Sequence, residues 1–216
     1  MTDVIADKKM TKGERTAQKI LDVSERIFAL KGYSGTSLRE VAGDVGIREP
    51  GLYRHFKSKD ELYRQVLERA LRPLADTMDN MLSVSEIDKA QIELLPAVMF
   101  RLLSRSPHVV ILLQRALSTD SFLQSDGSGG VWLEEWLSSL VVRGQQLFRH
   151  LQIKKNATDV EVALIIVNWF NLCLGYFTSA KLFEQISGRD AFSDSCLDQQ
   201  TALLQKISNV ILNDFV

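Results

Sequence analysis

The sequence has few of the residues that build metal sites, disulfide frameworks and catalytic centres. It contains 2 cysteines, 3 histidines and 4 prolines in 216 residues. The histidines (His55, His108 and His150) are far apart, and Cys173 and Cys196 do not form a CxxC pair. There is also no glycine-rich phosphate loop, no nucleophile–base pair and no internal repeat. We therefore expect a protein that is not an enzyme and needs neither a cofactor nor a metal.

Signals for export or membrane insertion are absent as well. Residues 1–13 are polar and charged, and no apolar run follows them as it would in a signal peptide. The most apolar stretch, Val160–Phe177, is interrupted by Glu161, Asn168 and Asn171, so we expect no membrane span. Both cysteines lie in apolar helical patterns, which favours buried thiols in a reducing compartment, with a redox sensor as the alternative. These patterns fit a cytoplasmic protein.

What the chain does have is helical periodicity and an uneven distribution of charge. Long segments repeat apolar residues every three to four positions, and alternating β-branched runs are scarce, which predicts an all-α protein. The net charge is only −1. Residues 1–72, however, carry 15 Lys and Arg against 11 Asp and Glu, whereas residues 73–216 carry 11 against 16. The positive charge of the N-terminal part is suited to a polyanion such as nucleic acid.

Two short helices joined by a tight turn are predicted at about residues 37–56. Ser37 and Glu40 have the spacing of a capping box, so the first helix begins there. Gly46 supplies the left-handed residue that ends it, and the second helix starts near Arg48. Because the second helix is polar and partly basic outside, the pair indicates a helix-turn-helix that lays one helix in the major groove of DNA.

Longer helices precede and follow this pair. A first helix is predicted over about residues 13–31, with Gly32 as its stop. Ser58 and Glu61 form a second capping box, which starts a long helix, and Pro73 predicts a bend in that helix. The small core of this region is expected to consist of Phe28, Leu38, Val45, Leu52 and Phe56.

Residues 13–62 resemble the DNA-binding domain of TetR-family transcriptional regulators. The matching positions are, in chain order, Phe28, Gly32-Tyr33, Thr36-Ser37, Val41-Ala42, Val45-Gly46, Leu52-Tyr53, His55-Phe56 and Lys59, closing at Leu62. We therefore expect a DNA-binding domain at 1–72 and a larger helical domain at 73–216, with about nine helices in all. The resemblance implies that the second domain forms a homodimer and binds a small effector.

Nine residues are candidates for contact with DNA. Thr36 and Ser37 lie at a helix N-terminus, which suits a phosphate group. The resemblance implies backbone contacts for Tyr53 and His55, and Lys59 is a further phosphate partner. Such contacts fix the register on DNA without reading its sequence. Base reading is expected from the recognition helix, that is, from Arg48, Glu49, Gly51 and Arg54.

One of these positions departs from the family pattern. The family usually has Ser or Thr where this chain has Arg48. The recognition helix thereby loses a hydroxyl cap and gains a charged donor that can bind a guanine bidentately. Whether Arg48 reads a base or binds a phosphate is left open by the sequence.

The C-terminal domain is predicted to hold five helices, over about residues 90–105, 107–119, 131–151, 158–186 and 193–214. A glycine- and serine-rich loop at 120–130 separates the second from the third. Thr158 and Glu161 form a third capping box. The last two helices are candidates for the dimer interface, because residues 160–177 carry more apolar surface than one core should need and Gly175 permits close approach. Burial within one subunit is the alternative.

An effector pocket is expected in the middle of this domain. Asn168 and Asn171 are informative, because amides in an apolar helix need partners. For each aromatic candidate, plain core packing is the alternative. The candidates contain no recurring charge, which favours a neutral and largely hydrophobic effector; they are Met78, Met81, Phe100, Leu103, His108, Leu112, Trp132, Trp136, Asn168, Trp169, Asn171 and Tyr176.

Together these patterns predict a homodimeric repressor that binds an operator with two-fold symmetry and is released by a small apolar effector. Linkage requires the antagonism to be reciprocal, so that DNA weakens effector binding by the same factor. Two alternatives stay open: a DNA-bound scaffold that engages a protein partner without a small ligand, and an activator.

Overall fold

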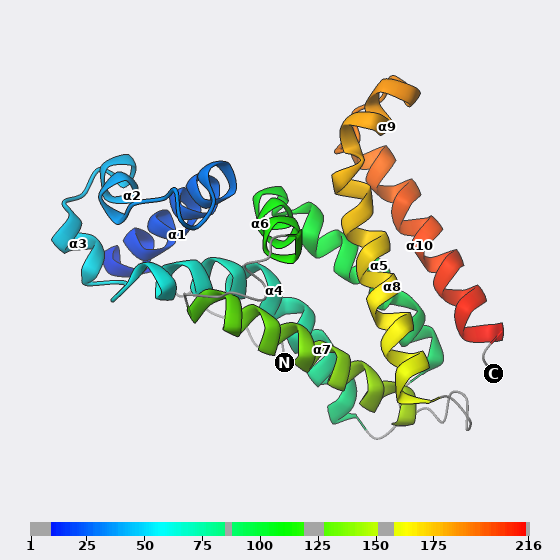
Figure 1. Cartoon of the computed structure of the whole chain (residues 1–216). Helices are drawn as coiled ribbons and strands as arrows, with labels where there is room; N and C mark the ends of the chain where they lie inside the picture. Colours follow the sequence, from blue (N-terminus) through cyan, green and yellow to red (C-terminus); the bar gives the residue numbers. More distant parts are fainter. Residues whose placement is uncertain (1–9, 85–87, 119–127, 151–157, 215–216) are drawn as a thin grey trace, which may run out of the picture. The chain divides into compact units, whose positions relative to one another are not determined.

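The computed structural model describes residues 10–84, 88–118, 128–150 and 158–214, and the regular structure in them is entirely α-helical. This confirms the all-α prediction. The chain divides into two compact units, Met1–Val66 and Leu67–Val216, with the division inside the fourth helix. The helices (Figure 1) are α1 (Lys12–Lys31), α2 (Leu38–Val45), α3 (Glu49–Tyr53), α4 (Lys59–Ser83), α5 (Lys89–Ser104), α6 (Pro107–Ser118), α7 (Ser128–His150), α8 (Asp159–Thr178), α9 (Ala180–Ser187) and α10 (Asp194–Asp214).

The described residues thus hold ten helices rather than about nine, because the predicted helix over 158–186 is two helices. Ser179 ends α8 and also begins α9, with a backbone (φ −93°, ψ 6°) outside the helical range. Its short polar side chain has a weak preference for a helix interior. Gly188 then ends α9 in the left-handed conformation, as the sequence suggested. The Thr158–Glu161 capping box at the start of α8 is confirmed.

One other boundary differs from expectation. The glycine- and serine-rich segment 120–130 falls largely outside the described residues, but its last residues, from Ser128, belong to α7. Helix α4 continues through Pro73 to Ser83, and the bend at Pro73 stays a prediction. The carbonyl of Pro73 accepts a hydrogen bond from the Thr77 hydroxyl (2.7 Å).

The first unit, called here the reader unit, has a small core of buried apolar residues. All five predicted core residues are buried, and Ile20 and Leu62 join them. Aromatic rings add to this core: the Phe28 and Tyr63 centroids are 5.0 Å apart, edge to face, and Tyr33 and Tyr63 are 5.2 Å apart. This packing holds α2 and α3 on a rigid support.

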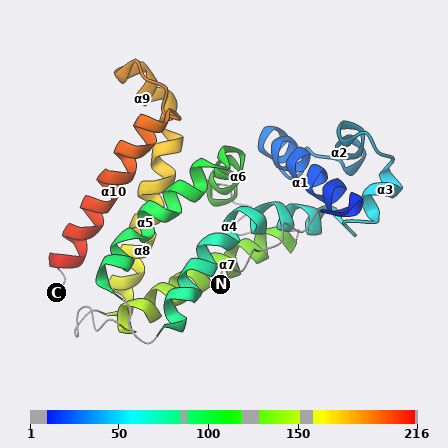
Figure 2. The ribbon, with the colours of Figure 1, turned by 180° about the vertical axis from the view of Figure 1, so that it is seen from behind.

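In the second unit, called here the sensor unit, α5 and α10 pack side by side (Figure 2). Near the start of α5, the Lys89 ammonium donates to the Asn213 side chain (2.6 Å). Near the end of α5, Arg101 pairs with Asp198 at the start of α10. Because the start of each helix lies beside the end of the other, the pair is antiparallel.

A second antiparallel pair in the sensor unit is formed by α7 and α8. Arg149 pairs with Asp159 across the connection (2.6 Å). Further along, a Cβ added at Gly144 would lie 2.3 Å from Ile166 Cδ1, so the glycine allows the two helices to approach closely. Helix α7 is also bound to α4 by Arg143 and Asp79, with Nε–Oδ1 at 2.6 Å.

Helix α8 is apolar on nearly every side. By length and composition alone it could cross a membrane, and among the described residues the bent pair α5–α6 passes the same test if taken as one span. Core helices of water-soluble proteins also pass it. On α8 the exposed apolar residues form a face that no other described helix covers; they include Val160, Leu164, Val167 and Leu172.

Candidate functional site

The predicted helix-turn-helix is formed by α2 and α3. The Ser37 hydroxyl accepts a hydrogen bond from the Glu40 amide (3.2 Å) and so caps the first turn of α2. Gly46 ends α2 with φ 82° and ψ 31°, in the left-handed region. Only Ile47 then separates it from Arg48, the N-cap residue of α3. The starts and the stop that were predicted for these helices are confirmed.

Basic side chains of α1 hold α2 in place. The Lys19 ammonium donates to the last carbonyl of α2 (2.8 Å), where it also complements the negative end of the helix dipole. Arg26 pairs with Asp44 (2.7 Å), and Lys31 pairs with Glu40 (2.5 Å). Both carboxylates of α2 therefore have cationic partners, which reduces the negative field beside the turn.

Four other cations of this region are left for an external partner. Their side chains are exposed and form no ion pair with any residue that the structure describes: Arg39, Arg48, Arg54 and Lys57. Arg39 and Lys57 were not among the sequence candidates. Their charge was visible in the sequence, but only the ion pairs of their neighbours show which cations remain free. Exposed unpaired guanidinium and ammonium groups suit phosphate groups.

The remaining candidates on or near α3 are accessible to different degrees. Glu49, Gly51 and Tyr53 lie on α3 itself, and Tyr53 is 48% exposed. A Cβ at Gly51 would meet only Ile47, at 3.8 Å. His55 lies just beyond α3 and is half-buried, with its ring 6.5 Å from the adjacent phenylalanine ring.

Thr36 and Lys59 are engaged inside the reader unit. Thr36 is buried, its hydroxyl donating to the Gly32 carbonyl (2.8 Å) and its amide to the Tyr33 carbonyl (3.2 Å). The Lys59 ammonium lies 4.4 Å from the centroid of the Tyr33 ring. Burial lowers the pKa of Lys59, against the opposing effect of Asp60. In this arrangement the two residues hold the α1–α2 connection and the start of α4.

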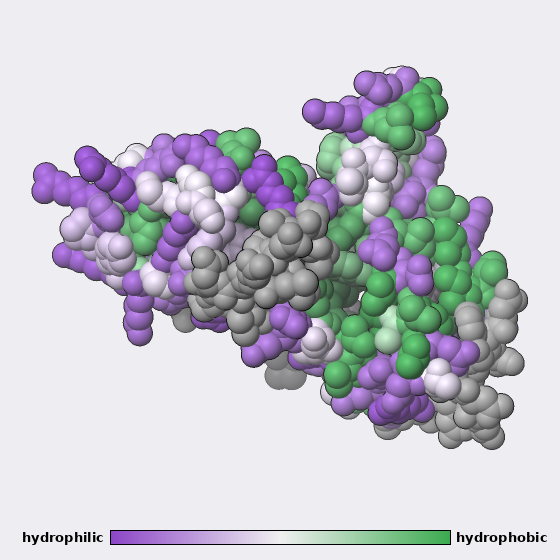
Figure 3. Space-filling view, in the orientation of Figure 1, coloured by the Kyte–Doolittle hydropathy of each residue, from purple (hydrophilic) through white to green (hydrophobic). Residues whose placement is uncertain are grey.

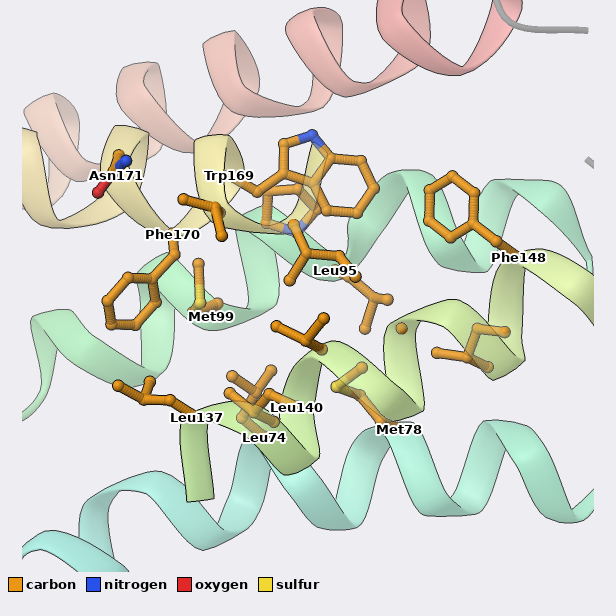
Figure 4. Close-up of a pocket in the computed structure, with 16 residues that line it drawn as sticks. Leu74, Met78, Leu95, Met99, Leu137, Leu140, Phe148, Trp169, Phe170 and Asn171 are labelled. Atoms are coloured by element: carbon orange, nitrogen blue, oxygen red, sulfur yellow. The ribbon is translucent and has the colours of Figure 1, made fainter. Parts of the chain in front are cut away.

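The sensor unit contains a cavity of about 300 Å³ (Figure 4). It lies between α4, α5, α7 and α8, which contribute 16 lining residues. Only Asn171 and Trp169 carry a side-chain nitrogen or oxygen; the others are leucine, valine, isoleucine, methionine, phenylalanine, proline and glycine. Figure 4 shows the Trp169 Nε1 turned toward α10 and away from the cavity. This nitrogen is buried and has no hydrogen-bond partner in the described residues. The cavity therefore suits an apolar guest.

The sequence candidates for a pocket fall into separate groups. Met78, Trp169 and Asn171 line the cavity, whereas Leu103 and Trp136 line a neighbouring space of about 10 Å³. The other seven line neither space: Met81, Phe100, His108, Leu112, Trp132, Asn168 and Tyr176.

Several of these residues have a packing role instead. The Tyr176 hydroxyl donates to the Ala191 carbonyl (2.7 Å), and its ring contacts Phe100 edge to face at 5.2 Å. The exposed amide of Asn168 donates to the Leu164 carbonyl one turn earlier in its own helix (2.8 Å). That internal bond satisfies an amide for which the sequence argument required an outside partner.

Most of the wall consists of residues that the sequence did not single out. They come chiefly from α5 and α7, and include Leu95, Pro96, Met99, Leu140, Gly144 and Phe148. Their apolar character was evident, yet nothing in the sequence distinguishes a side chain that lines a space from one that fills a core.

Cys173 contacts the cavity wall from behind. Its thiol donates to the Pro96 carbonyl (3.3 Å), and burial raises its pKa to about 12. A thiol with this pKa stays protonated at neutral pH and is a poor nucleophile. Cys173 and Cys196 are both free and buried, as expected.

Comparison with known proteins places residues 20–66 within the family described as bacterial regulatory proteins, tetR family. AcrR of Shigella flexneri, a transcriptional regulator, is 39% identical over 64 residues, which are 30% of this chain and 30% of AcrR. IcaR of Staphylococcus epidermidis, a negative regulator, is 36% identical over 58 residues, 27% of this chain and 31% of IcaR. FasR of Mycolicibacterium smegmatis, a transcriptional activator, is 39% identical over 61 residues, 28% of this chain and 27% of FasR. The chain thus matches less than a third of the length of each relative.

Solved structures extend the likeness in fold to nearly the whole chain. A transcriptional regulator from Aquifex aeolicus covers 91% of this chain and 99% of its own, with a TM-score of 0.58 and 21% identity. AibR, solved in complex with isovaleryl coenzyme A and operator DNA, covers 89% of this chain and 97% of its own, with a TM-score of 0.63 and 16% identity. With residues 20–66 matched in sequence and its helices matched in fold, the chain carries the DNA-binding domain of the tetR family of bacterial regulatory proteins and has the fold of such regulators.

Proposed function

We propose that this protein is a cytoplasmic, homodimeric transcriptional repressor that binds an operator with two-fold symmetry and is released by a small, largely apolar effector. The observation that carries the proposal is the apolar cavity of about 300 Å³ in the sensor unit of a chain whose reader unit is a helix-turn-helix. A protein that only read DNA would have no need of such a cavity.

The reader unit supports DNA binding through its charge and its geometry. Arg39, Arg48, Arg54 and Lys57 offer unpaired cations to phosphates or bases. Helix α3 has only 5 residues, so one protomer contacts few base pairs. Two protomers on a two-fold operator double the site, which is how helix-turn-helix proteins reach useful specificity.

The exposed apolar face of α8 supports dimerisation. Val160 and Leu164 are 68% and 55% exposed in the isolated chain, and on α10 Leu203 and Val210 are 50% and 58% exposed. Apolar surface of this extent on neighbouring helices is characteristic of an interface between proteins. A second copy of the chain is the partner that a symmetric operator requires.

The cavity supports a neutral effector of moderate size. A volume of about 300 Å³ holds about ten water-sized groups, and no charged residue lines it. AibR, which shares the fold, was solved with both an acyl coenzyme A and DNA. Helix α4 provides a physical route for coupling, since it starts beside the helix-turn-helix and carries Leu74 and Met78 into the cavity wall.

Of the two alternatives, the activator is favoured by the likeness to FasR, which covers only the DNA-binding part. The scaffold without a ligand is disfavoured by the cavity. Deleting the gene and measuring transcripts of the genes next to its binding sites separates repressor from activator, because their levels rise in the first case and fall in the second.

The direct test starts with operators selected from a random double-stranded DNA library by the purified protein. Fluorescence anisotropy of the selected DNA is then followed while neutral apolar compounds are added. We expect selected sequences with two-fold symmetry and release by at least one compound that also protects the sensor unit against thermal unfolding. Failure to select any sequence contradicts the regulator; tight DNA binding that no cavity ligand changes supports the scaffold.

A further inference from the structure

The cavity is closed on one side and open on the other. Its lining residues from α4 and α5 are all buried, Met78 and Leu95 among them. On α8, by contrast, Val167 is 46% exposed and Asn171 is exposed as well. The opening therefore lies along α8, on its side toward α7. Figure 3 shows a hollow on this face, bordered by hydrophobic residues.

The two exposed lining residues also belong to a longer row on α8. Its members recur every three to four positions, so they share one side of the helix. All are exposed and none is charged; this row, called here the α8 stripe, is Val160, Leu164, Val167, Asn168, Asn171, Leu172 and Gly175. Val167 and Asn171 thus belong both to the edge of the α8 stripe and to the mouth of the cavity.

The composition of the α8 stripe points to a copy of itself as its partner. A two-fold contact places the same surface on both sides, so it favours a stripe without charges that would repel their own copies. The asparagine amides can pair with each other, because each is both donor and acceptor. At Gly175 an added Cβ would find no atom within 4 Å, which leaves room for a second helix.

We propose that the mouth of the cavity is closed by the α8 stripe of a second copy of the chain, so that the effector site is complete only in the dimer. The inference rests on the proposed effector function of the cavity and adds its regulation. If the partner subunit seals the guest in, dimerisation raises the affinity for the guest. By linkage, the bound guest then raises the dimerisation affinity by the same factor.

The test separates dimerisation from the cavity wall. Leu164→Asp places a charge on the stripe at a residue that does not line the cavity. Val142→Asp is the matched control, since Val142 is 51% exposed on α7, outside both the stripe and the lining. The assembly state is measured by analytical ultracentrifugation, folding by circular dichroism, and guest binding with the neutral fluorophore N-phenylnaphthylamine.

We expect Leu164→Asp to be a folded monomer that binds the fluorophore at least about tenfold more weakly. A loss of this size corresponds to one valine-sized apolar contact that the partner no longer provides. Val142→Asp should match the unmodified protein in assembly state and in affinity for the fluorophore. A monomeric Leu164→Asp with unchanged affinity overturns the inference and leaves the effector function standing. If it stays dimeric, Leu172→Asp is added, and a double variant that is still dimeric overturns the inference too. A dimer of the unmodified chain that binds no fluorophore contradicts the effector function itself.

Discussion

The reader unit and the sensor unit differ in packing and in the charge around their candidate sites. In the reader unit the predicted core residues are all buried, and Arg39, Arg48, Arg54 and Lys57 around α2 and α3 are exposed without an ion-pair partner among the described residues. In the sensor unit Arg101, Arg143 and Arg149 are each paired with an aspartate, while the interior keeps an open space. A surface that binds a polyanion needs rigid support and free charge. An interior that admits a guest needs unfilled volume and little charge, and the two demands are met in separate parts of the chain.

The difference in packing is tested most strongly by two matched leucine truncations. Leu52 is fully buried in the reader core, and Leu140 is buried on the cavity wall. Leu52→Ala should lower the free energy of unfolding by about 2–5 kcal/mol. Leu140→Ala should cost less, because its side chain already faces empty space and loses fewer contacts. Urea denaturation followed by circular dichroism measures both; equal losses would mean that the sensor interior is as well packed as the reader core.

A smaller effect is expected from the residue that replaces the usual hydroxyl cap. Arg48 is exposed and makes no side-chain cap on α3, so its guanidinium is available to DNA. If it reads a base, Arg48→Ala weakens binding to the operator by about 1–3 kcal/mol and relaxes the preference at one base pair in each half-site. Selection from a DNA library with each protein shows this. A uniform loss over all sequences identifies Arg48 as a phosphate contact.

Burial of the Cys173 thiol gives the sensor unit its own pH dependence. Its pKa is raised from 9.0 to about 12, so above pH 9 the unfolded chain releases this proton while the folded chain retains it. Folding stability must therefore fall as pH rises from 9 toward 12, by up to about 1.4 kcal/mol per pH unit. Cys173→Val should reduce that slope in thermal melts between pH 8 and 10.5. Parallel curves for the two proteins would show that the thiol ionises in the folded state.

The smallest effect concerns a single free cation. Lys57→Ala removes an exposed ammonium that has no ion-pair partner among the described residues. We expect the variant to bind specific and random DNA more weakly by a similar factor. In a plot of log affinity against log salt concentration, the magnitude of the slope should fall by about 0.9, which corresponds to one lost phosphate contact. Lys31→Ala is the control, because Lys31 is already paired with Glu40. If both variants change the slope equally, ion pairing does not decide which cations meet DNA.

The reader unit could be predicted from sequence because its signals are local. Ser37, Gly46 and the Ser58–Glu61 spacing set helix ends through contacts within one turn, and the structure has those ends. One contact in the reader unit could not be predicted in this way. The Thr36 hydroxyl donates to the Gly32 carbonyl, and the spacing of residues in the sequence does not reveal this bond.

The sensor unit resisted prediction because its features depend on contacts between distant helices. The break at Ser179 divides a continuously apolar run, and the sequence on either side continues a helical pattern. The cavity wall depends on how α5 and α7 face α8, which left Leu95 and Met99 indistinguishable from core residues. Of the twelve pocket candidates, only Met78 on α4 and Trp169 and Asn171 on α8 line the cavity.

The close approach at Gly144 gives the sensor unit a simple means of changing its selectivity. A single methyl group at this position would meet Ile166 Cδ1 and displace that side chain, whose own position is on the cavity wall. We therefore expect residue 144 to limit the size of the guest that the proposed effector site admits, while it is remote in sequence from every candidate DNA contact. A change of effector would then need only one codon and would leave the DNA-reading residues unaltered, which makes this position the natural starting point for a biosensor of new specificity.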